Sequence, residues 1–167
     1  MGSSVSYIQL GEWDKALEFL NELVKKYPYA DFIEEAESLR IEAMVKKGSY
    51  RDARVSVQQF QLRFPSGRFR EKIQFYYALS FYQEKQWKEA AQALESFHKS
   101  YPQSQYRKET LEALGYSYRN LGQEEKARDY FAQIEGQENA FLVADTFYQE
   151  KKWQQAQSAF LKYLNTT

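Results

Sequence analysis

The three prolines of this chain fall at a constant interval, and each one ends the same kind of phrase. Pro28, Pro65 and Pro102 lie 37 residues apart, and an aromatic residue precedes each of them. Proline cannot continue a helical hydrogen-bond ladder, so each phrase marks the end of a helix. A unit of this length, recurring along 167 residues, predicts an array of stacked helix pairs.

Alanines give the register of the second helix in each pair. The anchors are Ala16, Ala53, Ala90, Ala127 and Ala156. Apolar residues recur four and seven positions after each anchor, as Leu94 and Phe97 do after Ala90. Residues at these spacings share one face of a helix. Three positions before four of the anchors stands an aromatic residue, and we expect Trp13, Trp87 and Trp153 to pack into the turn.

The first helix of each pair is also amphipathic and precedes the anchor. A short turn joins it to the second helix. Gly11, Gly48 and Gly122 lie five residues before their anchors, where a left-handed residue ends a helix. Asp31 and Glu34 are expected to cap the helix that follows Pro28. The expected helices cover roughly 12–27, 31–47, 50–64, 67–84, 87–101, 105–120, 124–135, 138–150 and 153–165.

The last interval between anchors departs from the 37-residue spacing of the others. Ala127 and Ala156 are 29 residues apart, and no proline separates them. Gly136 is expected to end the intervening helix instead. This irregular unit is where we expect the geometry to depart from the regular repeat and to carry something specific to this protein.

Composition excludes several classes of function. The chain has no cysteine, so disulfides and thiolate metal sites are impossible. Its single histidine, His98, cannot form a metal site of several histidines, and we expect it to be a structural or surface residue. The acidic clusters on the expected helices are typical of solvated faces. Net charge is zero, which speaks against a nucleic-acid partner. We therefore expect no catalysis, no cofactor, no metal and no segment inserted in a membrane.

These patterns resemble the tetratricopeptide repeat (TPR). The matching residues are Leu111, Leu114, Gly115 and Tyr118 in one helix, and an alanine followed by an apolar residue and a proline in the other. The length of the repeat unit and the Tyr-Pro-x-Ala/Ser phrase are similar to those of bacterial envelope TPR proteins. Examples are the lipoprotein of the β-barrel assembly machinery and the periplasmic protein associated with the Tol–Pal system. The resemblance implies an all-α solenoid of antiparallel helix pairs in a right-handed superhelix, which scaffolds other proteins in the periplasm or cell envelope; a cytoplasmic location is the alternative.

Helical phase predicts a concave groove with an aromatic middle. In a TPR array the first helix of each pair lines this face. The residues in the relevant phase are Phe75, Leu79, Tyr82, Tyr116, Arg119, Phe141, Asp145 and Tyr148. Acidic residues such as Glu35, Glu42 and Glu112 flank them. An equally good interpretation is that the aromatic side chains pack against the neighbouring helix.

The sequence thus predicts a protein-binding scaffold. Residues 1–4 read like an added leader, and residues 5–167 like one TPR array of about four and a half repeats. The partner would be another protein or peptide, with apolar anchors for the groove. The alternative is a structural array that forms homo-oligomers through its ends, because Leu161 and Leu164 lie on the side where another repeat would stack.

Overall fold

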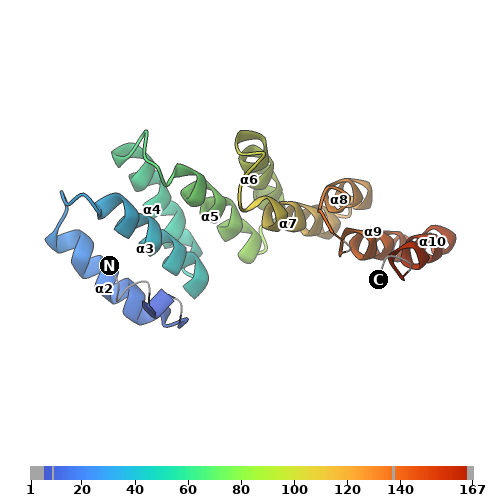
Figure 1. The fold of residues 1–167 in the computed structure, drawn as a ribbon, viewed down its shortest axis with the longest axis horizontal. Coiled ribbons are helices and arrows are strands. Elements are labelled where there is room, and N and C mark those ends of the chain that lie inside the picture. Colours follow the sequence, from blue (N-terminus) through green and yellow to red (C-terminus); the bar gives the residue numbers. More distant parts are fainter. Residues whose placement is uncertain (1–5, 9, 137, 165–167) are drawn as a thin grey trace. The chain divides into compact units, whose positions relative to one another are not determined.

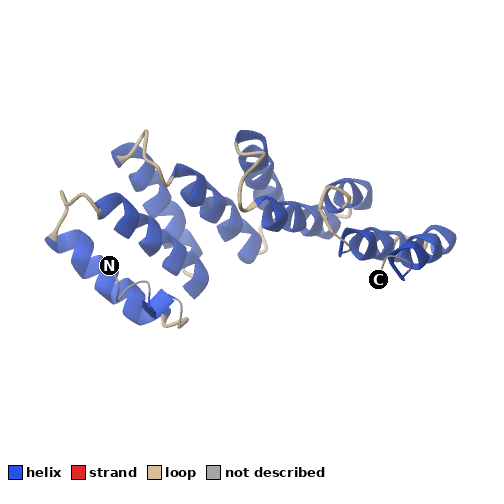
Figure 2. Cartoon of the chain, in the orientation of Figure 1, coloured by secondary structure: helices blue, strands red, loops and turns tan. Residues whose placement is uncertain are grey.

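The computed structural model describes residues 6–8, 10–136 and 138–164, and all regular structure in them is helical (Figure 2). The chain divides into two compact units, Met1–Glu84 and Lys85–Thr167. A helical turn at 6–8 precedes the first anchor, Ala16, and the expected leader lies outside the described residues. The helices of Figure 1 are α2 (Trp13–Lys26), α3 (Ile33–Lys47), α4 (Tyr50–Arg63), α5 (Arg70–Gln83), α6 (Trp87–Ser100), α7 (Arg107–Asn120), α8 (Glu124–Phe131), α9 (Glu138–Gln149) and α10 (Trp153–Leu164).

In the first unit, α3 is the central helix. It packs against α2, α4 and α5, so its buried residues face several directions. Ile41 faces this core with Val57 and Phe60 of α4, and all three are almost fully buried. The second helices of the pairs, α2 and α4, bury a single stripe at the spacing that the anchors predict, Ala16 with Leu20 and Ala53 with Phe60.

The turn between the helices of a pair uses a left-handed residue at one fixed position. Gly11, Gly48 and Gly122 have φ of 72°, 94° and 72°, as expected. Lys85 and Lys151 occupy the same register and also have positive φ, 61° and 60°. A non-glycine residue rarely adopts this conformation, so the repeat geometry rather than the residue type determines the backbone here.

The aromatic-proline phrases form the loops between pairs. Tyr27, Phe64 and Tyr101 are the C-caps of α2, α4 and α6, and each donates its backbone N–H to the carbonyl four residues earlier. The next residue is proline, which has no N–H with which to extend the helix. A turn follows each time, in which the third residue after the aromatic donates back to the aromatic carbonyl, as Ser104 does to Tyr101 at 3.1 Å.

The prediction that Asp31 and Glu34 cap α3 is wrong. The helix begins at Ile33 with Phe32 as its N-cap, and no side chain caps it. Glu34 instead accepts a hydrogen bond from the backbone N–H of Phe69, at 3.0 Å, in the loop that follows α4. A methyl group on Gly67 would overlap the Glu34 carboxylate. Gly67 therefore stands where the other loops have Ala30 and Ser104, because this carboxylate needs the space.

In the second unit, α6 packs against α7, α7 against α8, and α9 against α10. The core includes Leu94, Leu114 and Phe131, which are fully buried. Gly115 lies against the Phe131 ring, and a methyl group there would overlap it. Glycine in the middle of a helix is destabilising by roughly 0.5–1 kcal/mol relative to alanine, so this position is explained by close packing.

The irregular unit departs from the others through its second helix. The sequence predicts a helix over 124–135, but α8 ends at Phe131 and has 8 residues where α6 has 14. Ile134 nevertheless remains in the core, 1% exposed, because a tight turn brings its N–H to the Phe131 carbonyl at 3.1 Å. Gly136, with φ of 103°, then turns the chain toward α9. The core position seven residues after the anchor is kept while the helix itself is cut short.

Candidate partner-binding site

The predicted groove residues come from the first helices of successive pairs. Phe75, Leu79 and Tyr82 belong to α5 in the first unit. Tyr116 and Arg119 belong to α7 in the second unit, while Phe141, Asp145 and Tyr148 belong to α9.

In the first unit, α5 presents less of an aromatic surface than its sequence phase predicts. Phe75 is only 1% exposed, and its ring packs edge-on against Tyr76 at 5.4 Å. The expectation of Phe75 as a groove anchor is therefore wrong, and the alternative of packing within the array holds for this residue. Leu79 and Tyr82 are half-buried.

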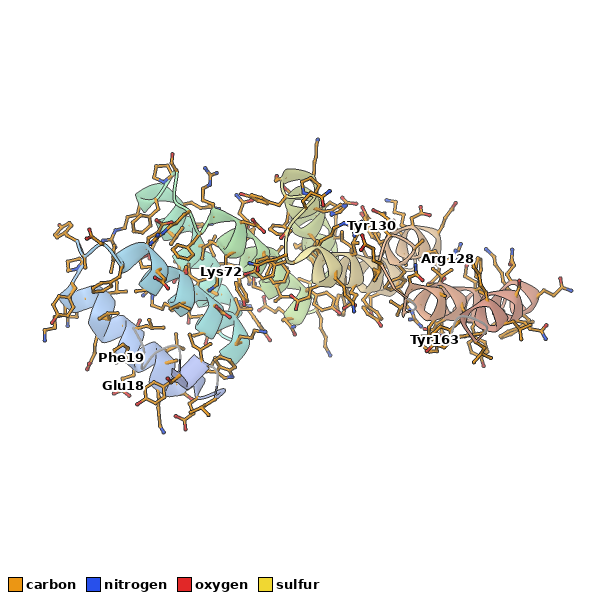
Figure 3. The ribbon with its side chains drawn as sticks, viewed as in Figure 1. Glu18, Phe19, Lys72, Arg128, Tyr130 and Tyr163 are labelled. Atoms are coloured by element: carbon orange, nitrogen blue, oxygen red, sulfur yellow. The ribbon has the colours of Figure 1, made fainter. Side chains whose placement is uncertain are left out.

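Glu42, one of the two acidic residues expected to flank the groove in the first unit, is neutralised. Lys72 of α5, labelled in Figure 3, pairs with Glu42 of α3 at 2.6 Å. The Tyr76 hydroxyl also donates to Glu42, at 2.7 Å. The carboxylate thus serves to join α3 to α5, and this part of the surface offers little free negative charge to a ligand.

The second unit holds an open pocket built mainly from aromatic side chains, which we call the aromatic pocket. It has a volume of about 350 Å³ and is lined by Glu112, Tyr116, Phe141, Leu142 and Tyr163. These residues come from α7, α9 and α10. The pocket therefore brings together two of the predicted groove residues, Tyr116 and Phe141, which lie 25 residues apart in the sequence.

Other rings hold the aromatic pocket in shape. The Tyr116 ring lies edge-on to the buried Phe131 at 5.2 Å between centroids. The Phe141 ring lies 5.7 Å from Phe160 and 5.8 Å from Tyr163, yet 47% of Phe141 remains exposed. A large apolar ring that is supported on one side and open on the other is the usual form of a contact residue.

Arg119 and Asp145 form an ion pair that joins α7 to α9. Arg119 Nη1 lies 2.7 Å from Asp145 Oδ2, and both side chains are mostly buried. Glu124 lies in the same charged environment: burial raises the pKa of its carboxyl group, while Arg119 acts in the opposite direction. The sequence places Arg119 and Asp145 in the groove as polar contacts for a partner. In the structure their main interaction is with each other.

A second exposed aromatic pair lies where α9 ends and α10 begins. Tyr148 is 53% exposed and Trp153 is 56% exposed, and their rings meet edge-on at 5.2 Å. Trp153 lies at the turn, as its register predicts, but more than half of the side chain is exposed, so it does not belong to a core. Its helix buries little apart from Ala156, so the ring at the start of α10 has less to pack against.

Sequence reasoning missed two residues that line the aromatic pocket. Leu142 carries no signal, since it lies outside both the core stripe and the groove stripe. Tyr163 stands seven residues after Ala156, the register at which Phe97 and Ile134 are buried, and it is only half-buried here. The repeat register alone therefore assigned Tyr163 to the core.

Comparison with protein families gives one match that spans most of the chain. The model of the YfiO outer membrane lipoprotein family matches residues 3–156. The chain belongs to this family. The resemblance to envelope TPR proteins is thereby confirmed, and the matched segment includes every predicted groove residue of the YfiO-type array. No helix among the described residues of this family member is long and apolar enough to cross a bilayer.

Solved structures confirm the TPR-type fold. MamA from Desulfovibrio magneticus RS-1 superposes with a TM-score of 0.76 at 18% identity, over 98% of this chain and 90% of that chain. Kinesin light chain TPR-like repeats from Podosopora anserina give 0.76 at 15% identity, over 98% and 91%. MamA from AMB-1 gives 0.71 at 16% identity, over 98% and 87%. Comparison with curated protein sequences found no significant match. At these identities the structural similarities establish that the YfiO-family chain is an all-α solenoid, and its function has to be argued from its own surface.

Proposed function

We propose that this chain is a non-catalytic scaffold that binds another protein or peptide through the aromatic pocket, in an assembly of the bacterial cell envelope. TPR arrays present preformed surfaces, so a partner loses little conformational entropy on binding. The envelope location is supported by the family's description as an outer membrane lipoprotein. The proposal treats residues 5–167 as one array of about four and a half repeats.

The exposure of Phe141 is the observation that carries the proposal. The ring is half exposed although it lies among Phe160, Tyr163 and Tyr116, so an apolar side chain of a partner could cover it with little rearrangement. Glu112 at the same pocket pairs with Lys108 of its own helix at 4.0 Å, so apolar contact with the rings rather than charge would carry recognition. An apolar peptide segment fits this surface better than a nucleic acid, which requires a basic one.

Substitution of Phe141 tests the proposal. Peptides selected from a displayed random library against the wild-type chain provide the ligand, and fluorescence anisotropy gives the dissociation constant. Phe141→Ala should weaken binding roughly tenfold or more, as the removal of a central anchor does. Its thermal midpoint should fall by only a few degrees, because the ring is already half exposed.

Tyr29→Ala is the matched control, since Tyr29 is an aromatic residue 95% exposed in the loop between α2 and α3. It should leave binding unchanged. Equal affinities of wild type and Phe141→Ala would refute the proposal. A large loss of stability in Phe141→Ala would instead assign the ring to the core.

Self-association is the second candidate function, and the exposed face of α10 favours it. In α2 and α6, the position five residues after the anchor contacts the following helix: Asn21 of α2 accepts a hydrogen bond from Arg40 of α3, and Glu95 of α6 accepts one from Tyr118 of α7. In α10 this position is Leu161, which is 52% exposed, and Leu164 on the same face is 62% exposed. A second copy of the chain could cover these two leucines.

A further inference from the structure

The aromatic pocket has two walls, and they come from different helices. Glu112 and Tyr116 of α7 form one wall. Phe141 and Leu142 of α9, together with Tyr163 of α10, form the other. The helices α9 and α10 pack against each other, so the second wall is built on one packed pair. The shape of the pocket therefore depends on how α9 is held against α7.

Apolar burial contributes little to holding α9 in place. Among the side chains of α9 that the structure describes, only Ala144 and Thr146 are buried, and both are small. In α7, by contrast, Leu111, Leu114 and Tyr118 are buried. Burial of apolar area is the main stabilising contribution to helix packing, at about 25 cal/mol per Å². Polar contacts therefore have a larger share in fixing the position of α9.

The ion pair between α7 and α9 lies directly beside the pocket. Arg119 Nη1 is 2.7 Å from Asp145 Oδ2. Arg119 follows Tyr116 by three residues on α7, and Asp145 follows Phe141 by four residues on α9. Residues at these spacings are neighbours on one face of a helix, about 5.4 Å apart along its axis. On both helices, the ion pair thus lies one turn away from a ring that lines the pocket.

The first unit has apolar residues at the positions of this pair. Relative to the anchors, Arg119 and Asp145 correspond to Val45 of α3 and Leu79 of α5. The helices α3 and α5 pack against each other, and Val45 is buried. A charge-assisted hydrogen bond weakens steeply when its atoms move apart or tilt, whereas apolar contact tolerates small shifts. The ion pair therefore fixes the spacing of α7 and α9 more narrowly than apolar residues would.

A second ion pair holds the other end of α9. Arg128 of α8, labelled in Figure 3, pairs with Glu150, which directly follows α9, and its guanidinium group lies 4.5 Å from the centroid of the Phe147 ring. Its two side chains are 14% and 22% exposed, against 22% and 26% in the first pair. Glu150 lies about two and a half helical turns beyond Phe141. This pair therefore holds α9 without bordering the pocket.

We propose that Arg119 and Asp145 are positioning residues for the aromatic pocket. Their ion pair holds Phe141 at the spacing from Tyr116 that an apolar side chain of a partner needs. The partner contacts the rings, and the two charged residues set the distance between them before it arrives. Such preorganisation lowers the cost of binding. The assignment rests on the proposed function, since it concerns the same pocket.

Binding of the library-selected peptides tests this role. Arg119→Gln and Asp145→Asn each remove one charge but keep a polar side chain of similar shape, and each should weaken binding about fivefold. The double variant Arg119→Val with Asp145→Leu installs the residues of the first unit and should bind nearly as wild type does, because a packed apolar pair can replace an ion pair. Thermal unfolding of each variant checks that it folds.

Arg128→Gln is the matched control, because it removes an ion pair of similar exposure from the same helix. Its thermal midpoint should fall about as far as that of Arg119→Gln, while its affinity for the peptides stays at the wild-type value. A purely structural role of Arg119 would make the two variants bind alike.

A distance measurement tests the ion pair without any ligand. The chain has no cysteine, so spin labels attached to Glu109→Cys of α7 and Gln157→Cys of α10 report a single distance by pulsed electron paramagnetic resonance. Both positions are exposed. The distance distribution should broaden when Arg119→Gln is added, and should narrow again in the variant that carries Val and Leu at the two positions.

Three results would overturn the proposal. One is a loss of affinity in Arg119→Gln but not in Asp145→Asn, since Arg119 would then contact the peptide itself. Another is an equal loss of affinity in Arg128→Gln, and the third is a distance distribution that Arg119→Gln leaves unchanged. Unchanged affinity of Phe141→Ala would refute the proposed function instead, and the distance measurement would still decide whether the ion pair holds α9 in place.

Discussion

Glu95 accepts hydrogen bonds from two tyrosines at once. The hydroxyls of Tyr118 and Tyr130 lie 2.5 Å and 2.9 Å from its Oε1 atom, and the two rings stack at 5.6 Å (Figure 3 labels Tyr130). Burial, together with the hydrogen bond to Glu95, raises the pKa of Tyr118 to about 12, and the same causes raise that of Tyr130. The neutral phenols are thus favoured in the folded chain. Their hydroxyl groups donate the hydrogen bonds that join α6, α7 and α8, and these bonds are lost when alkali deprotonates the tyrosines.

This arrangement predicts an alkaline loss of stability. The folded pKa values lie above the unfolded value of about 10, so the stabilisation is complete below pH 10 and is lost as the pH rises toward 12. Urea unfolding at pH 8, 10 and 11.5 should show a steep decrease in the wild type. The double variant Tyr118→Phe with Tyr130→Phe should decrease less over that range, and Tyr50→Phe, a tyrosine of the first unit, should behave as wild type. Parallel decreases in all three would contradict the assignment.

Individual residues also show where sequence register succeeds and where it fails. A left-handed turn residue was expected at Gly11, Gly48 and Gly122, and Lys85 and Lys151, which stand in the same register, adopt this conformation despite their side chains. Register also placed Phe75 on the groove stripe, whereas the residue is buried. The backbone conformation of the turn recurs in every repeat, but the exposure of a side chain depends on the particular residues that pack around it. The sequence therefore predicted two residues that line the aromatic pocket, Tyr116 and Phe141, but it did not predict which residues of the groove stripe stay exposed.

The packing of α7 against α8 depends on a size match between two positions. The residue twelve before the anchor and the residue four after it are Gly115 and Phe131 here, against Ile41 and Val57 in the first unit. In the pair of α7 and α8, the first helix thus has glycine, the smallest residue, at the position that meets the large phenylalanine of the second helix. Because interiors are close-packed, such pairs are expected to change together.

Gly115→Ala should destabilise the chain, although alanine is the better helix former. The added methyl group overlaps the Phe131 ring, and overpacking typically costs about 1–3 kcal/mol, offset by about 1 kcal/mol of helix propensity. Phe131→Leu alone should also destabilise, since it leaves a gap in a fully buried site. The double variant should recover about 1 kcal/mol or more relative to the sum of the single effects, measured by chemical denaturation. Strict additivity would show that the two residues are not coupled.

The elements whose limits the sequence mispredicted are those defined by distant contacts. Residues 124–135 carry a helical pattern, and Ile134 occupies the expected core position, yet α8 stops at Phe131. The same apolar spacing is satisfied by a helix or by a tight turn, so the pattern does not distinguish them. Glu34 likewise fits a local capping rule, but its hydrogen-bond partner, Phe69, lies 35 residues away. Local rules predict where helices occur better than they predict what their termini contact.

At the scale of the molecule, a helix surface that no neighbouring helix covers is open to contact with another protein. Among the described helices, α10 packs mainly against α9. The rest of its surface exposes Leu161, Leu164 and Trp153, which together give an apolar face in the second unit. Such a face is typical of surfaces that bind another protein.

Self-association through this face is therefore expected to depend on protein concentration. Sedimentation velocity from 5 to 500 μM should show a rising weight-average sedimentation coefficient for the wild type. The double variant Leu161→Lys with Leu164→Lys should remain monomeric, because two charges in an apolar contact would have to be desolvated. Leu62→Lys is the matched control, since Leu62 is 84% exposed on α4 of the first unit, and this variant should associate as wild type does. A wild-type chain that stays monomeric throughout this range would reject self-association and leave the apolar face of α10 to a different protein.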